Sequence, residues 1–252
     1  GDATAWPLHG TRALAAQLLG LIPPTLSLGI PLVWALANLD QLGSSLRDDL
    51  LPLSLRSLLL GVSAALLALA AALLLAIAKR WSSAVWLSSL TFLAGIGYAI
   101  PGTVLALALL LTGAPWQLAP LRLLPWGCSD RLLAVAKGGL DAALERISPN
   151  LDEAATGLGF NWQQVLRRVH LPLLRGPMTV GLLLVFVDTV KELPLTFALR
   201  PFDFDTLSVR VYQYASDERL AAALLPALMI LSLGLVAAMA LVPSLDQASS
   251  KG

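Results

Sequence analysis

Charged residues are scarce in this chain. Only 13% of its 252 residues are Asp, Glu, Lys or Arg, compared with about 25% in a typical soluble domain. Hydrophobic residues make up 57% of the chain, and its mean hydropathy is +0.76. So few polar side chains could not cover the surface of a soluble core of this size. The composition therefore indicates an integral membrane protein.

Cysteine and histidine are almost absent as well. The single cysteine, Cys128, excludes an internal disulfide bond and a cysteine-based zinc site, and we expect it to be inert. The two histidines, His9 and His170, lie far apart in the sequence, and we expect His170 on the surface of a loop or against a partner protein. We therefore expect no metal site and no cofactor, and a membrane enzyme is the least supported class of function.

Two further absences concern the partners. The chain has no P-loop of the form GxxxxGK[ST], so any ATP that drives its work is hydrolysed by another subunit. Its net charge of +1 creates no basic field that would attract nucleic acid. The sequence opens at Gly1 without the pattern of a secretory signal, and we interpret this start as a cut.

Apolar runs long enough to cross a membrane, which takes about 20 residues in a helix, recur along the chain. They cover residues 13–37, 58–78, 85–111, 178–196 and 220–242. Pro23, Pro24 and Pro31 predict a kink in the first run. Pro101 and Gly102 break the third run, where the backbone either lines a translocation pathway or bends for packing. These runs predict an all-α, polytopic membrane helix bundle of about five to six transmembrane helices.

The distribution of Lys and Arg predicts the topology. Basic loops stay in the cytoplasm, so Lys79 and Arg80 should share that side with the basic residues of 137–175. An even number of crossings then has to separate the two clusters. The run 85–111 is one crossing, so a second crossing is required within 112–136. This segment contains three prolines and several charges, and it is the weakest span of the sequence.

Residues 138–177 have the composition of a soluble loop, and the loop contains the signals of two short helices. Ser148 and Pro149 favour the start of the first helix as N-cap and first helical residue. Asp152 and Glu153 follow in its first turn, where the helix dipole favours carboxylates. Glycines at 157 and 159 are suited to end it.

The second short helix has its own start signal. Asn161, with Gln164 three residues later, predicts a capping box. The apolar residues that follow recur at helical spacing and predict a buried face, and Leu171 and Pro172 are expected to end the element. Two short helices that meet at a glycine turn would form a compact docking element.

The same segment carries a motif that resembles the EAA loop of the permease subunits of ABC importers. In that family an EAA tripeptide is followed by a glycine and then by an LP pair. The matching residues here are Glu153, Ala154, Ala155, Gly159, Leu171 and Pro172. The resemblance implies that the first helix is a cytoplasmic coupling helix, with Glu153 contacting an ATPase subunit or bracing the loop. The alternative is an ordinary amphipathic hairpin at the surface.

A second block sharpens the resemblance. The sequence FVDTVKELP at 186–194, LRPF at 199–202 and DTL at 205–207 resemble the KELP, LRP and TL segments of ferric-iron permeases. Those permeases often consist of two homologous halves, and this chain resembles the C-terminal half. The resemblance implies an importer of ferric iron that works with an ABC ATPase subunit, an extracytoplasmic solute-binding protein and a second permease half.

Four residues of this block are candidates for the translocation pathway. Asp188, Lys191 and Glu192 are ionisable residues near the end of an apolar run, where such groups usually face a cavity or one another. Pro194 then breaks the helix. The alternative is a structural pair between Asp188 and Lys191. A carboxylate pair that contacts Fe³⁺ directly is a third possibility.

The sequence thus predicts three parts. Residues 1–52 hold a kinked N-terminal transmembrane helix and an external loop, residues 53–245 the permease domain, and residues 246–252 a polar tail. The protein is expected in the plasma (inner) membrane in contact with lipid, with the EAA loop and the C-terminus in the cytoplasm. An ion-coupled secondary transporter and an inactive half-permease remnant remain as alternatives.

Overall fold

The computed structural model describes residues 9–38, 50–82, 84–116 and 119–249, and all regular elements within these ranges are helical. Four helices are long and apolar enough to cross a membrane, and two shorter apolar helices cover Val85–Ala99 and Gly102–Trp116. The predicted all-α, polytopic membrane bundle is therefore confirmed. The helices of 20 or more residues are α1 (Thr11–Ala37), α3 (Leu50–Trp81), α6 (Pro120–Arg146), α9 (Leu171–Val190) and α12 (Leu220–Ser249).

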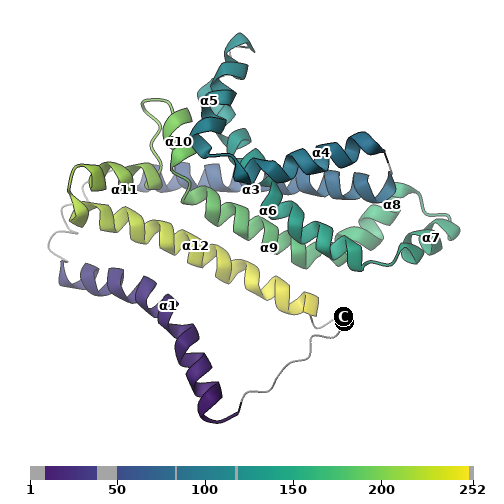
Figure 1. The fold of residues 1–252 in the computed structure, drawn as a ribbon, viewed down its shortest axis with the longest axis horizontal. Helices are drawn as coiled ribbons and strands as arrows, with labels where there is room; N and C mark the ends of the chain where they lie inside the picture. The colour runs from purple at the N-terminus through teal and green to yellow at the C-terminus, as the bar shows by residue number, and fades with distance from the viewer. Residues whose placement is uncertain (1–8, 39–49, 83, 117–118, 250–252) are drawn as a thin grey trace.

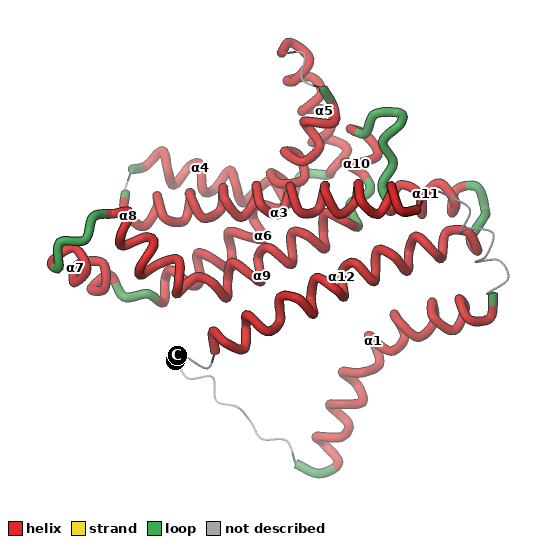
Figure 2. Tube along the Cα trace, turned by 180° about the vertical axis from the view of Figure 1, so that it is seen from behind, coloured by secondary structure: helices red, strands yellow, loops and turns green. Residues whose placement is uncertain are grey.

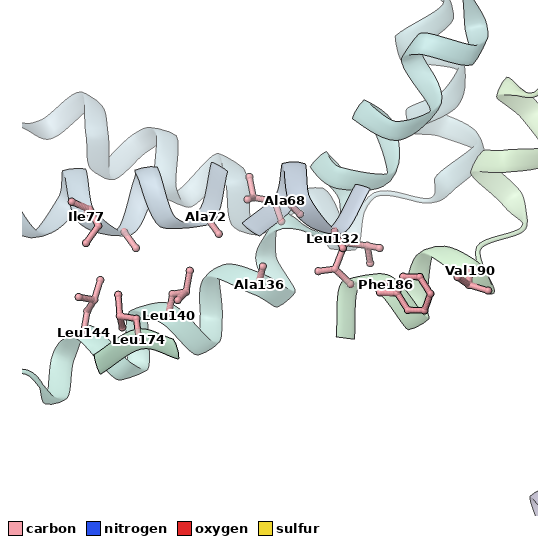
Figure 3. Close-up of a cluster of buried hydrophobic side chains, with 14 residues drawn as sticks. Ala68, Ala72, Ile77, Leu132, Ala136, Leu140, Leu144, Leu174, Phe186 and Val190 are labelled. Atoms are coloured by element: carbon pink, nitrogen blue, oxygen red, sulfur yellow. The ribbon is translucent and has the colours of Figure 1, made fainter. Parts of the chain in front are cut away.

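Three of these helices, α3, α6 and α9, form the core of the bundle (Figure 1). Small residues line the contact side of α3, where Ala68 and Ala72 are fully buried. They face Leu140 of α6 and Leu174 of α9, which are also fully buried (Figure 3). Close packing of this kind stabilises helix pairs in lipid, because apolar surface gains little by leaving one apolar medium for another.

Helix α6 covers most of the segment 112–136, the weakest span of the sequence. The helix begins only at Pro120 and continues to Arg146, so it is 27 residues long. It buries Leu124, Leu132 and Ala136 along one side of the bundle. A continuous helix thus lies where the sequence requires a second crossing, displaced toward the C-terminus, but α6 is not among the four helices that are long and apolar enough to cross a membrane. The loop expected from residue 138 onward therefore begins later than expected, because residues 138–146 are the last turns of this helix.

The loop expected at 138–177 also ends earlier than expected, because a long helix begins at Leu171. Helix α7 (Pro149–Gly157) and helix α8 (Trp162–Val165) are followed by a π-helical turn (Leu166–His170), which leads directly into α9. Leu171 and Pro172 therefore do not end the element but begin the next helix. Pro172 lacks the N–H that a regular helix needs, and the wider turn that precedes it accommodates this defect.

The predicted break at Ile100 and Pro101 is present. Helix α4 (Val85–Ile96) ends in a 3-10 turn (Gly97–Ala99), and α5 (Gly102–Gly113) starts after the break. Gly97 allows a close approach, since a Cβ there would lie 2.7 Å from the carbonyl oxygen of Asp130. Figure 2 shows α4 along the bundle and α5 projecting away from it.

The remaining helices complete the bundle. Helix α12 packs on α9 and on α11 (Leu207–Ser216), and α10 (Pro194–Leu199) contacts α5 and α6. Helix α1 lies beside one end of α12 and diverges from the bundle (Figure 1). Pro23, Pro24 and Pro31 lie inside α1, which remains helical but is bent. The polar tail expected at 246–252 lies partly outside the described residues, and nearly all of the external loop expected before residue 50 lies outside them.

Candidate functional site

The α7–α8 hairpin (residues 148–165) stands at one end of the bundle, and α10 and α11 stand at the other (Figure 1). Its local signals behave as the sequence predicts. The Ser148 hydroxyl accepts from the backbone N–H of Asn150. Asn161 and Gln164 form a reciprocal capping box, with hydrogen bonds of 2.9 and 3.0 Å. Gly159 has a φ of +84°, a left-handed conformation that favours glycine.

The residues of the EAA motif occupy distinct environments in this hairpin. Glu153 and Ala154 are exposed, whereas Ala155 is buried, and α7 packs against α8. Gly159 forms the turn between the two helices. Leu171 and Pro172 lie beyond the hairpin, in the first turn of α9. The hairpin therefore presents a carboxylate to the outside while one face of its helix is fixed.

Three charged or polar side chains form the base of the hairpin, and we call Arg80, Asp152 and His170 the hairpin root. Nε of Arg80 donates to Oδ2 of Asp152 at 2.7 Å. Nε2 of His170 lies 2.9 Å from Oδ1 of the same carboxylate. His170 is fully buried, so its expected position on the loop surface is wrong. Trp81 packs edge-on against its ring, at 5.8 Å between centroids.

A second set of polar side chains lies at the opposite end of α9 from the hairpin root. Helix α9 has 20 residues and is therefore about 30 Å long, at about 1.5 Å per residue. Here Glu192 forms an ion pair with Arg131 of α6. The Glu192 carboxylate also accepts from the backbone N–H of Leu195 at 3.2 Å, at the start of α10. Gly102 lies directly against this ion pair, because a Cβ at position 102 would be 3.0 Å from both charged side chains. We call Gly102, Arg131, Glu192 and Leu195 the distal cluster.

The candidates for a translocation pathway are thus only partly brought together. Gly102 and Glu192 meet in the distal cluster, and Pro101 and Pro194 flank it in the chain. Asp188 forms an ion pair of 2.8 Å with Lys191, whose side chain is 62% exposed. This geometry matches the structural pair that the sequence left open as an alternative. Each of the two carboxylates has its own cationic partner, Lys191 for Asp188 and Arg131 for Glu192.

Arg131 and the hairpin root are the functional candidates that sequence reasoning missed. In the sequence, Arg131 is one of the charges that weaken the expected span in 112–136. A charge inside an apolar helix needs a partner, and Glu192 was a carboxylate without one, so the two could have been matched. Asp152 was assigned to the helix dipole alone, and the sequence holds no signal that joins it to His170.

Comparison with known proteins gives consistent results. Residues 133–248 match the family described as "Binding-protein-dependent transport system inner membrane component". The chain is 28% identical over 216 residues to an Fe(3+)-transport system permease protein, FbpB 2, of Haemophilus influenzae. That match covers 81% of this chain and 42% of the relative, so the chain spans less than half of the relative's length.

The fold has a relative of known structure. A bacterial ABC transporter involved in the import of the acidic polysaccharide alginate has a chain that superposes with a TM-score of 0.66 at 16% identity. The superposition covers 94% of this chain and 95% of the other. At this identity the likeness concerns the fold alone. The family match over residues 133–248 agrees with the resemblance that the EAA motif indicated.

Proposed function

We propose that the chain, whose residues 133–248 match the inner-membrane components of binding-protein-dependent transport systems, is a permease subunit that moves ferric iron across the plasma (inner) membrane. ATP hydrolysed by a separate ABC ATPase subunit drives the transport. An extracytoplasmic solute-binding protein delivers the iron, and a second permease half completes the pathway.

The observation that carries this proposal is the α7–α8 hairpin. It is capped at the starts of both helices and presents Glu153 to the outside at one end of the bundle. Force between two proteins has to pass through a small element that does not deform, and a capped helix with a fixed base meets this demand. We assign Glu153 to the contact with the ATPase subunit.

The choice of iron rests on the sequence block at 186–207 and on the name of the relative, which is an Fe(3+)-transport permease. The relative is more than twice as long as the matched segment, which agrees with a permease that contains a second half. The distal cluster lies at the end of the bundle opposite the hairpin, and we propose that it lines or gates the pathway on the extracytoplasmic side.

Transport by the reconstituted complex tests the proposal. The permease with its second half, ATPase subunit and binding protein is placed in vesicles, and uptake of ferric iron is measured with and without ATP. Glu153→Lys is expected to abolish ATP-driven uptake without loss of the folded protein. Glu145→Lys is the matched control, because Glu145 is equally exposed but lies on α6 outside the hairpin. Uptake that persists without ATP would instead support an ion-coupled secondary transporter.

A labelling experiment tests the orientation. Single cysteines at Asn150 and at Phe202, both exposed and at opposite ends of the bundle, are introduced in a Cys128→Ser background. An impermeant thiol reagent added to intact cells is expected to label position 202 and to spare position 150. Labelling of position 150 from outside would place the hairpin on the wrong side for an ATPase and would favour an inactive remnant.

A further inference from the structure

The hairpin root joins four helical elements through the Arg80–Asp152 pair. Arg80 lies near the end of α3 and binds Asp152 of α7. Its guanidinium also donates to the carbonyl oxygens of Leu144 at 2.8 Å and Ile147 at 3.0 Å, where α6 ends. His170, in the turn that precedes α9, approaches the other oxygen of the same carboxylate. The covalent chain connects α7 only to α6 and to α8, so its link to α3 depends on these side chains.

The contacts of this site are those of a rigid junction. Planar guanidinium groups form strong, directional hydrogen bonds with carboxylates and carbonyls. The side chains of Arg80 and Asp152 are only 14% and 19% exposed, and His170 is fully buried. Trp81 packs edge-on against both His170 and Trp162, so the first residue of α8 is tied to the same place. Ion pairs on open surfaces lack this support and contribute little.

We propose that Asp152 is the positioning residue that makes the α7–α8 hairpin and α3 move as one body. A displacement of the hairpin then passes through the Arg80–Asp152 contact directly into α3, the longest helix of the core. Without this contact the hairpin can follow the ATPase while α3 stays behind. The inference rests on the proposed function, because it assumes that a partner displaces the hairpin.

The first arm of the test measures the junction itself. Spin labels are attached to cysteines at Leu158, which is 77% exposed on the hairpin, and at Leu74, which is 72% exposed on α3. The full chain carries Cys128→Ser and is held in lipid nanodiscs. The unsubstituted junction is expected to give one narrow distance, and Asp152→Asn is expected to give a broad distribution.

Asp141→Asn is the matched control for Asp152→Asn. It removes the same charge from an ion pair of comparable burial, but its partner Lys137 lies on the same helix, α6. The control is expected to keep the narrow distance. If Asp152→Asn does not accumulate as folded protein, Arg80→Lys provides the same test, because lysine keeps the charge but cannot reach the carboxylate and the carbonyls together.

The second arm measures coupling in the complete transporter. Uptake per ATP hydrolysed is expected to fall about tenfold in Asp152→Asn, the effect of losing one charge-assisted hydrogen bond, and to stay unchanged in Asp141→Asn. An unaltered distance, or a broadened distance with unaltered uptake per ATP, would overturn the inference. If the unsubstituted complex shows no ATP-driven uptake, the proposed function fails, and the distance arm still decides whether Asp152 holds the hairpin to α3.

Discussion

Substitution of Glu192 by Gln should reveal how much the distal cluster stabilises the bundle. The amide keeps an oxygen for the backbone N–H of Leu195 but removes the charge that faces Arg131. Breaking a fully buried ion pair costs about 3–5 kcal/mol, and an unpaired charge in a spanning helix costs about 2.5–3.5 kcal/mol. The two side chains here are 21% and 13% exposed, so water relieves part of this penalty. We therefore expect a loss of about 2–3 kcal/mol.

A double-mutant cycle separates the pair from its surroundings. Arg131→Met removes the other charge and is expected to cost a similar amount, whereas the double variant leaves no unpaired charge. The double variant should therefore be about 1–2 kcal/mol more stable than the sum of the single losses predicts. The free energy of unfolding is measured for each variant in mixed micelles with increasing fractions of a denaturing detergent.

A comparison with Asp188→Asn and a test of additivity decide whether Glu192 and Arg131 stabilise each other. Asp188→Asn breaks the neighbouring pair with Lys191, which is largely exposed, and should cost less than about 1 kcal/mol. If the losses of Glu192→Gln and Arg131→Met add within about 0.5 kcal/mol, the two charges do not stabilise each other. The distal cluster would then be two independent solvated charges.

Four glycines give further predictions, each checked by the same unfolding measurement. Gly102→Ala should destabilise the protein by about 1–3 kcal/mol because the new methyl meets the distal cluster, whereas Gly95→Ala, with no atom within 4 Å, should stabilise it by about 0.5–1 kcal/mol. A higher stability of Gly102→Ala would show that position 102 does not lie this close to the distal cluster. Gly61→Ala should cost about 1–3 kcal/mol, since its Cβ would lie 2.9 Å from the ring of Phe186. Gly159→Ala should cost about 1–2 kcal/mol because its φ is +84°, and an unchanged stability would show that the turn relaxes.

Local signals in the sequence predicted local structure well. Ser148 and Asn161 begin their helices as expected, because a cap depends only on residues two or three positions away. The break at Pro101 was also predictable, because proline acts on its own backbone. Leu171 and Pro172 are the exception among local signals, since proline in the first turn of a helix is as acceptable as proline after its end.

Contacts between distant residues leave no local signal in the sequence, and a charge inside an apolar run indicates at most that a partner exists. Helix α6 has a poor hydropathy because Asp130, Arg131 and Lys137 count as isolated charges in any average along the chain. In the structure Arg131 pairs with Glu192 and Lys137 with Asp141. His170 was placed on the surface for a related reason, because its burial depends on Asp152 and Trp81, which belong to other helices.

The break between α4 and α5 has a consequence for biogenesis. Val85–Ala99 and Gly102–Trp116 are each shorter than the about 20 residues that a spanning helix needs, so neither is suited to leave the translocon for the bilayer alone. Helix α6 follows with Arg131, whose partner Glu192 is synthesised only after α9. We expect residues 85–146 to stay beside the translocon until α9 emerges. Residues 85–146 would thus enter the bilayer together with α9 and not one helix at a time in the order of synthesis.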